Sequence, residues 1–445
     1  MKYHKYIFLI QILLLSIFIV SCSSVPTRFI NAENSLGTNG DTGMLFHAAV
    51  YYPKEINIKF DSYIIGVEKS YREKISLPSD IQINEKNSPV SASNLFNDSK
   101  LLFISHIVKN NNEPNSNKNC FIYNAYNQKK VTYKQFAPYC DGADNNEIEP
   151  INAFKNSWDA LKELKNSILN RVKENTYSHI IVITMGWNTT QEEAIFNFNS
   201  ILSNMKEQSK QKFNPLVIGV TWPSEWESSY IQPFLIKMVS FANKAKDADE
   251  LGMSWLGVLI HQTIPSATNL PIIVIGHSFG ARATSAATCI GPMIQNKDEY
   301  ITPKNVNTLI NLQGAFRTDR LFEKLDKFSK INITYPYGCP NVKTLVLTSS
   351  SYDDAVTSHF WGTPYAGTTE SYEKYCLENT DPRIQCKTVD STGEIKNFHG
   401  AKGIVFVKAN ELIRENAYNT SGGAHSDIYR AEHGKFINQF INFNK

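Results

Sequence analysis

Short apolar runs alternate with helical patterns from about residue 150 to the end of the chain. Six of them have the length and composition of buried strands: HIIVIT (179–184), PLVIGVTW (215–222), PIIVI (271–275), VNTLINL (306–312), VKTLVLTSS (342–350) and GIVFVKA (403–409). Helices are expected around them, at 192–206, in a long stretch ending near 265, at 281–290 and at 426–442. This alternation predicts an α/β fold with a mostly parallel central sheet flanked by helices, which binds ligands at the carboxyl ends of its strands.

The preceding region, residues 43–149, contains strand-like runs such as FDSYIIGV and LLFISHIV but no motif that indicates a function. It is a β-rich N-terminal extension that either continues the sheet or forms a separate β-domain. The predicted organisation is therefore a targeting segment at 1–21, a flexible tether at 22–42, the β-rich region at 43–149 and a main domain at 150–445.

One of the six strands runs directly into a serine between two glycines, in PIIVIGHSFGARATSAA (271–287). A sharp turn between a strand and a helix exposes a serine hydroxyl to a substrate, and glycines two residues before and after it let the chain pass close by. Gly276 and Gly280 hold those positions around Ser278. A serine hydroxyl needs a nearby base to become a nucleophile, so this stretch predicts a catalytic Ser278.

This stretch resembles the nucleophile elbow of the α/β-hydrolase fold, in the GHSxG form of lipases and esterases. The resemblance covers about residues 150–445. Two other stretches, ITMGWNTT and VTWPSEW, resemble loops of a poorly characterised bacterial branch of that fold. Met185 stands where the first loop usually has a histidine. The resemblance implies a Ser–acid–His triad in that chain order and no metal or cofactor.

The base implied by this resemblance is His425, in the loop SGGAHSD that follows the last predicted strand. His399 precedes that strand and would lie at its other end, whereas His433 falls within the last predicted helix. His359 follows the preceding strand and could line a pocket.

The acid should follow the strand before the one that leads to His425, where TSSSYDDAV offers two aspartates. Asp353 is favoured over Asp354 because a hydrophobic residue, Val356, stands three positions after it, as in the family pattern. Asp319 is a third candidate, because some lipases place the acid one strand earlier. The acid would orient the imidazole and stabilise its protonated form.

Two backbone N–H groups are expected to form the oxyanion hole. One belongs to Phe279, directly after the serine, and the other to Trp187 in the loop ITMGWNTT. The aromatic residues Trp222, Trp226, Phe360 and Trp361 are further candidates for lining the site.

The N-terminus resembles a bacterial lipoprotein signal. Lys2 and Lys5 precede an apolar run, Tyr6 to Val20, that is short for a membrane-spanning helix and suits a signal peptide. Cys22 follows a small residue, as the lipidated cysteine does in a lipobox. The next residue is Ser23. In Gram-negative lipoproteins, a residue other than aspartate at this position goes with sorting to the outer membrane.

Composition supports an exported globular protein. Hydrophobic residues make up 42% of the 445 residues, and the net charge of +3 excludes a typical nucleic-acid-binding protein. Apart from Cys22 the chain has an even number of cysteines, and disulfides 120–140 and 376–386 would close the shortest loops. Oligomeric state is not indicated.

The combined prediction is an envelope-anchored serine hydrolase that cleaves carboxylic esters through Ser278, His425 and Asp353. A lipase, phospholipase or acyltransferase would use the same residues, and a segment at 360–401 is long enough to form a cap over a lipid substrate. The alternative from another class is an inactive hydrolase scaffold that serves as a surface binding protein.

Overall fold

The structure is a computed structural model of the whole chain. It describes residues 58–69, 77–83, 95–97, 101–112, 119–125, 138–143, 152–187, 189, 191–209, 213–224, 233–296, 301–322, 335, 338–356, 364–378, 381–398, 400, 402–415 and 422–441. Cys22 with the predicted signal peptide and tether, and His359, His399, Trp226, Phe360 and Trp361, lie outside these residues.

Ten strands of the described residues form one sheet, in the order β11-β12-β10-β9-β7-β5-β6-β1-β3-β4. The strands are β1 (Ser62–Lys69), β3 (Leu102–Asn110), β4 (Asn119–Asn124), β5 (His179–Thr184), β6 (Pro215–Thr221), β7 (Ile272–His277), β9 (Val306–Leu312), β10 (Val342–Ser349), β11 (Ile384–Thr388) and β12 (Gly403–Lys408). All neighbouring pairs from β11 to β1 are parallel, and only β3 and β4 run antiparallel to their neighbours. The six strands expected from the apolar runs are all present within two residues.

The N-terminal region continues this sheet. β1 pairs with β6 in parallel and with β3 in antiparallel register, so its described strands do not form a separate domain. A short second sheet joins β2 (Ile81–Ile83) to β8 (Ile294–Asn296).

The segment at 360–401, expected as a possible cap, is built differently where the structure describes it. Its residues form α10 (Thr369–Cys376) and β11, and β11 is the edge strand of the central sheet. Both elements pack against β12, so the described part of this segment extends the central sheet.

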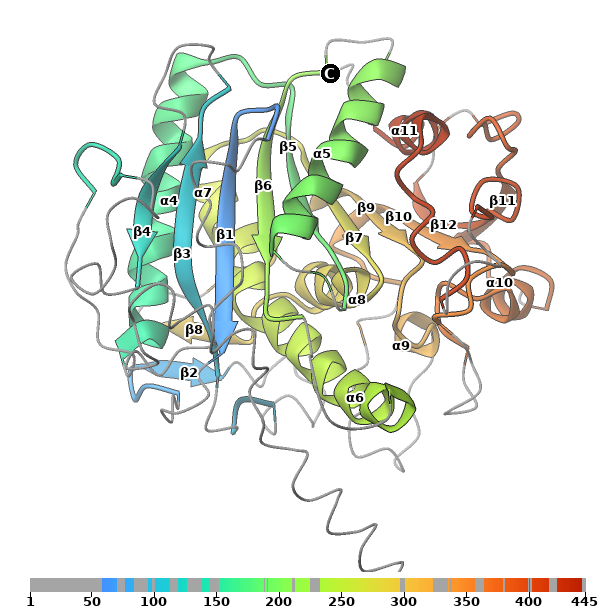
Figure 1. Cartoon of the computed structure of the whole chain (residues 1–445), viewed down its shortest axis with the longest axis horizontal. Helices are drawn as coiled ribbons and strands as arrows, with labels where there is room; N and C mark the ends of the chain where they lie inside the picture. The colour runs from blue at the N-terminus through green and yellow to red at the C-terminus, as the bar shows by residue number, and fades with distance from the viewer. Residues whose placement is uncertain are drawn as a thin grey trace, which may run out of the picture.

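Helices cover both faces of the sheet. The longer ones are α4 (Ala153–Glu174), α5 (Gln191–Gln208), α6 (Pro233–Leu251), α8 (Phe279–Ser285), α10 and α11 (Ala431–Asn438); α7 (Ile264–Ala267) and α9 (Asp319–Phe322) are short, and η4 (Gly252–Leu256), η5 (Leu259–Thr263) and η6 (Ala286–Ile290) are π-helical. In Figure 1, α5 and α11 lie side by side in front of the sheet, while α4 and α8 lie behind it. The predicted class, an α/β fold with a mostly parallel sheet and a β-rich N-terminal extension, is confirmed.

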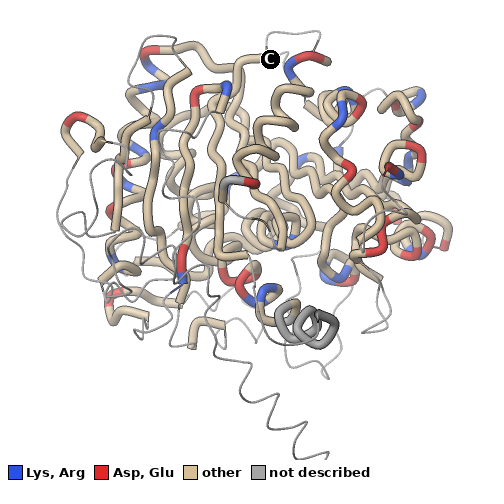
Figure 2. The backbone as a smooth tube through the Cα atoms, in the orientation of Figure 1, with Lys and Arg blue, Asp and Glu red and all other residues tan. Residues whose placement is uncertain are grey.

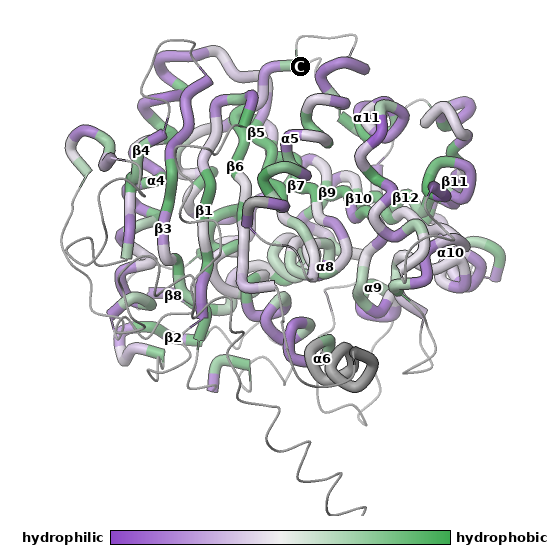
Figure 3. The backbone as a smooth tube through the Cα atoms, viewed as in Figure 1, coloured by the Kyte–Doolittle hydropathy of each residue, from purple (hydrophilic) through white to green (hydrophobic). Residues whose placement is uncertain are grey.

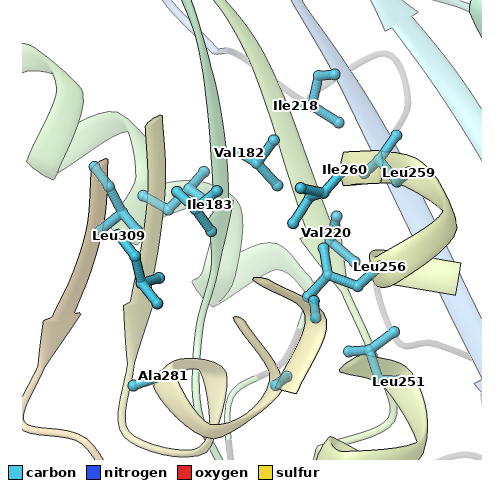
Figure 4. Close-up of a cluster of buried hydrophobic side chains, with 14 of the residues drawn as sticks. Val182, Ile183, Ile218, Val220, Leu251, Leu256, Leu259, Ile260, Ala281 and Leu309 are labelled. Atoms are coloured by element: carbon cyan, nitrogen blue, oxygen red, sulfur yellow. The ribbon is translucent and has the colours of Figure 1, made fainter. Parts of the chain in front are cut away.

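Apolar side chains from the strands meet the helices in a continuous core. Val182 of β5 and Val220 of β6 face Leu256 and Ile260 of the π-helical stretch (Figure 4). Hydropathic colouring is greenest along these central strands (Figure 3), whereas charged residues gather in the outer helices and loops (Figure 2). Among the described residues, none of the helices combines the length and the apolar character that a membrane span requires.

Three disulfides lie within the described residues. Cys120–Cys140 and Cys376–Cys386 confirm the two predicted pairings. The third, Cys289–Cys339, joins η6 to the segment before β10, and both of its cysteines are buried.

The arrangement places several chain turns at one edge of the sheet. Because the strands from β1 to β11 are parallel, the residues that follow β5, β6, β7, β9 and β10 all emerge at their carboxyl ends, which in Figure 1 lie toward α6. The predicted site residues Trp187, Ser278 and Asp353 follow β5, β7 and β10, and His425 follows β12.

Candidate active site

Ser278 forms the turn between β7 and α8, and its backbone lies in a region that residues with side chains rarely adopt, with φ 56° and ψ −123°. Strain of this kind persists only where the surroundings impose it. Ser278 N donates to Leu312 O over 3.1 Å, and Ser278 O accepts from Ala315 N over 3.1 Å. The turn after β9 therefore holds the serine backbone from both sides.

Neighbouring backbone atoms lie so close to Gly276 and Gly280 that no side chain fits at either position. A Cβ atom on Gly276 would lie 2.6 Å from Ala281 Cα, and one on Gly280 would lie 2.4 Å from Thr184 O. Any larger residue at either position would push α8 away from β5 and β7. The local pattern that predicted the elbow thus has a direct steric cause.

The loop after β5 lies against the serine. A Cβ atom on Gly186 would be 2.4 Å from Ser278 Cβ and 2.8 Å from its Oγ, so only glycine fits there. The backbone N–H groups of Phe279 and Trp187 donate to no backbone carbonyl of the described residues. The sequence analysis expected this loop near the serine through Trp187, but it did not single out Gly186.

The WPS stretch after β6 fixes this loop. Trp222 Nε1 donates to Met185 O over 2.9 Å, and Ser224 Oγ donates to Thr189 O over 2.8 Å. Met185, the departure from the family pattern, is buried, and its sulfur lies 4.0 Å from the Tyr429 hydroxyl. The two family-like stretches are therefore parts of one hydrogen-bonded unit.

Aromatic rings surround the Phe279 side chain. Phe241 of α6 lies 4.7 Å from Phe279 between ring centroids, and it contacts Trp187 and Tyr365 at 6.2 Å each. Trp222 is a core residue that acts through its indole N–H, whereas Trp187 is half-buried beside the serine loop.

The structure brings Asp353 and His425 together. His425 Nδ1 donates to Asp353 Oδ2 over 2.8 Å, and the carboxylate is fully buried. Because the carboxylate can only accept at that bond, Nδ1 carries the donated proton, and Nε2 is the ring nitrogen that can act as a base. Within the described residues, no hydrogen bond joins the Ser278 hydroxyl to His425.

A short backbone pairing sets the distance between these two loops. Asp354 N donates to Gly422 O over 3.2 Å, and Ala424 N donates to Tyr352 O over 2.6 Å. Gly423 between them has φ 59°, and a Cβ there would lie 2.3 Å from Tyr352 O. The glycine pair of SGGAHSD thus lets the histidine loop approach the acid.

The other two candidate acids lie in different environments. The Asp354 side chain is exposed, and no described residue pairs with its carboxylate. Asp319 begins α9 and pairs with Arg317, whose Nε lies 3.1 Å from Asp319 Oδ2. Of the later histidines that the structure describes, His433 is buried in α11 and makes no contact with Asp353.

His277, next to the serine, connects to the histidine loop. Its Nε2 donates to His425 O over 2.9 Å, and the two rings lie 4.7 Å apart. Burial, and then the neighbouring His425, lower the pKa of His277 to about 3. The ring is therefore neutral at ordinary pH and serves as a hydrogen-bond donor to the loop that carries His425.

Comparisons with known proteins agree with this architecture. A family model described as "Alpha/beta hydrolase of unknown function (DUF900)" matches residues 160–319, from α4 to the start of α9. The chain has the α/β-hydrolase fold. The matched part of the chain includes the serine turn and the loop after β5, and it ends before Asp353 and His425.

Two solved structures are also similar. The catalytic core domain of acetyl xylan esterase from Trichoderma reesei is 13% identical, with a TM-score of 0.24, over 38% of this chain and 82% of that chain. An uncharacterized protein from Bacillus cereus ATCC 10987 is 11% identical, with a TM-score of 0.26, over 60% of this chain and 67% of that one. No curated protein matches the chain.

Among the described residues, no three His, Cys, Asp or Glu side chains lie close enough together to hold a metal ion. The polar groups that the structure places at the carboxyl ends of the strands include the Ser278 hydroxyl, the His425 imidazole and the buried Asp353 carboxylate. This set is suited to acyl transfer through a covalent intermediate.

Proposed function

We propose that the protein is a serine hydrolase that cleaves carboxylic esters. The observation that supports this most is the 2.8 Å hydrogen bond from His425 Nδ1 to the buried Asp353, at the same edge of the sheet as the strained Ser278. An imidazole held by a carboxylate in this tautomer is ready to accept a proton at Nε2.

In the proposed reaction, Ser278 Oγ attacks the ester carbonyl while His425 Nε2 takes the hydroxyl proton. The C–O bond to the alcohol breaks as that proton passes to the leaving oxygen, which produces an acyl-enzyme. Water, deprotonated by His425, then attacks the acyl carbon and restores Ser278. The backbone N–H groups of Phe279 and Trp187 would stabilise the oxyanion, each by roughly 3 kcal/mol.

The Ser278–His425 bond would have to form when substrate binds. Catalytic hydrogen bonds are often long in the empty enzyme and tighten in the substrate complex. In our proposal the Ser278 hydroxyl turns toward His425, because the His425 loop is held by backbone bonds to Tyr352 and Asp354 and by His277.

A fluorophosphonate probe tests the proposal directly. The wild-type protein should be labelled, whereas Ser278→Ala and His425→Ala should each lose labelling and nearly all hydrolysis of a p-nitrophenyl ester. Both variants should keep the wild-type circular dichroism spectrum. A folded wild-type protein that neither reacts with the probe nor hydrolyses esters would favour the binding-protein alternative.

We also propose that the chain is exported and anchored in the envelope through a lipid on Cys22, with the outer membrane as its location. The three disulfides support this, because disulfides persist in oxidising compartments. An ester of a lipid is one substrate that such an anchored enzyme would meet.

A further inference from the structure

Gln313 is the first residue after β9 and adopts a left-handed backbone conformation, with φ 47°. A glutamine rarely adopts this conformation, and residues held in it cluster at functional sites. The neighbouring Leu312 O and Ala315 N are the two groups that hold the Ser278 backbone. The strained residue is therefore part of the turn that carries the nucleophile.

The Gln313 side chain reaches the acid. Its Nε2 donates to Asp353 Oδ2 over 2.7 Å, and this is the same oxygen that accepts from His425 Nδ1. The other oxygen, Oδ1, accepts from the backbone N–H groups of Ala355 at 3.0 Å and Val356 at 3.3 Å. Four donors thus surround a carboxylate that has no exposed surface, and Gln313 supplies the only side-chain donor besides His425 among the described residues.

The orientation of the Gln313 amide is fixed from its other side. Gln313 N donates to Thr348 Oγ1 over 2.9 Å, and the Thr348 hydroxyl donates back to Gln313 Oε1 over 3.0 Å. Since Oε1 is occupied by this hydroxyl, Nε2 must face Asp353. The side chain therefore cannot rotate without breaking hydrogen bonds on both sides.

We propose that Gln313 is a positioning residue for the reaction proposed above. Together with Ala355 and Val356 it fixes the rotation of the Asp353 carboxylate, so that Oδ2 faces His425. It also joins the acid to the turn that holds Ser278, so that nucleophile, base and acid keep one geometry. A neutral amide suits this role, because it orients the carboxylate without cancelling the negative charge that stabilises the imidazolium.

Two substitutions separate side-chain reach from backbone strain. Gln313→Met keeps the length but removes the side-chain hydrogen bonds to Asp353, Thr348 and Gly367. Gln313→Asn tolerates the left-handed backbone but is too short to reach Asp353. Both should lower kcat for a p-nitrophenyl ester by about 10- to 100-fold, as misplacement of catalytic groups does, with KM nearly unchanged. The matched control is Gln385→Met on β11, which removes an amide donor to Lys402 O. This variant should keep the wild-type kcat.

Gln313→Glu provides a readout that a purely structural role would not change. Two adjacent carboxyl groups share one proton at low pH, and the pKa of one of them is strongly raised. While the introduced carboxyl group is protonated, it can still donate a hydrogen bond to Asp353 and should support activity. Activity should then fall as the pH rises and the shared proton leaves. The pH–rate profile of Gln313→Glu should therefore show an ionisation that the wild-type profile lacks.

Rates are taken per active site titrated by the fluorophosphonate, so that unfolded protein lowers the number of sites and not kcat. A wild-type kcat in both Gln313→Met and Gln313→Asn, with a wild-type pH profile in Gln313→Glu, would overturn the positioning role. A wild-type protein that does not react with the probe would overturn the proposed function, and this role with it.

Discussion

Asp353 and Asp354 are adjacent in the chain but lie in very different environments. The Asp353 carboxylate is fully buried and accepts four hydrogen bonds, whereas the Asp354 side chain is exposed and contributes its backbone N–H to the pairing with Gly422. A buried carboxylate needs all of these donors, since each one offsets lost hydration.

Asp353→Asn should lower kcat by roughly 10⁴-fold, because an amide cannot hold His425 in the required tautomer. Asp354→Asn should stay within about threefold of the wild-type value, since it changes an exposed group. Ester hydrolysis by the two purified variants measures this. Greater damage from Asp354→Asn would move the acid by one residue, and no effect from either would point to Asp319.

Individual site residues could be predicted from the sequence where a short sequence motif marks them. Ser278 and its two glycines lie within five residues, so their pattern can be read from the sequence, although the close approach that requires Gly280 comes from Thr184 of β5. Gln313 has no such pattern, because a glutamine after a strand becomes meaningful only through its contact with Asp353, forty residues away in the chain. Gly186 was missed for the same reason, since its neighbour is Ser278.

Among the elements, the loops after β5 and β6 act together. The indole N–H of Trp222 holds Met185 O, and Trp255 makes an equivalent bond over 2.8 Å to Leu102 O, at the start of β3. Both tryptophans are buried. They form a natural pair for testing whether loop position matters for the reaction.

Trp222→Phe keeps an aromatic ring but releases the loop after β5, and we expect kcat to fall about tenfold or more, because Trp187 N would lose its position. Trp255→Phe removes the same kind of hydrogen bond, so it should lower the melting temperature by a similar amount while kcat stays at the wild-type value. Equal effects of both substitutions on kcat would contradict a specific role for the loop.

Element boundaries were predicted best for strands. The last helix was expected over 426–442 but begins at Ala431, because Asp427 is used before it to accept from the backbone N–H groups of Arg414 and Glu415. The helix expected at 281–290 begins at Phe279 and continues as a π-helix from Ala286. Residue periodicity cannot distinguish these helix types over one turn.

At the scale of the whole molecule, four buried histidines make stability depend on pH. Burial lowers the pKa of His179, His261 and His433 to about 4, and burial with the neighbouring His425 lowers that of His277 to about 3. The unfolded chain has histidine pKa values near 6.5. Between about pH 6.5 and 4 the unfolded state thus binds protons that the folded state does not.

The free energy of unfolding should therefore be highest above pH 6.5. It should decrease as the pH drops from 6.5 to 4, by about 1 kcal/mol per pH unit for each histidine. Urea unfolding at pH 7, 6 and 5 measures the slope. His433→Leu should reduce the proton uptake on unfolding by about one. A slope near zero between pH 6.5 and 5 would show that these rings are not kept neutral.

Anchoring is the other property of the whole molecule that can be tested. Cys22→Ser should release the protein from membranes without changing its specific activity, because the lipid would be attached far from the site in the chain. Fractionation of cells that express each form measures this. If Cys22→Ser still sediments with membranes, the uncleaved run from Tyr6 to Val20 becomes the anchor to test.

The pairing of β1 with β6 has a consequence for how the chain is made. Ser62 pairs with Val217, so β1 leaves the ribosome long before its parallel neighbour exists. Until then this apolar strand can pair only with β3. The edge of β1 that later pairs with β6 is exposed during this time and can bind strands of other chains. A shortened protein that begins at residue 150 would leave the edge of β6 bare. It should aggregate during expression, even though every proposed catalytic group would still be present.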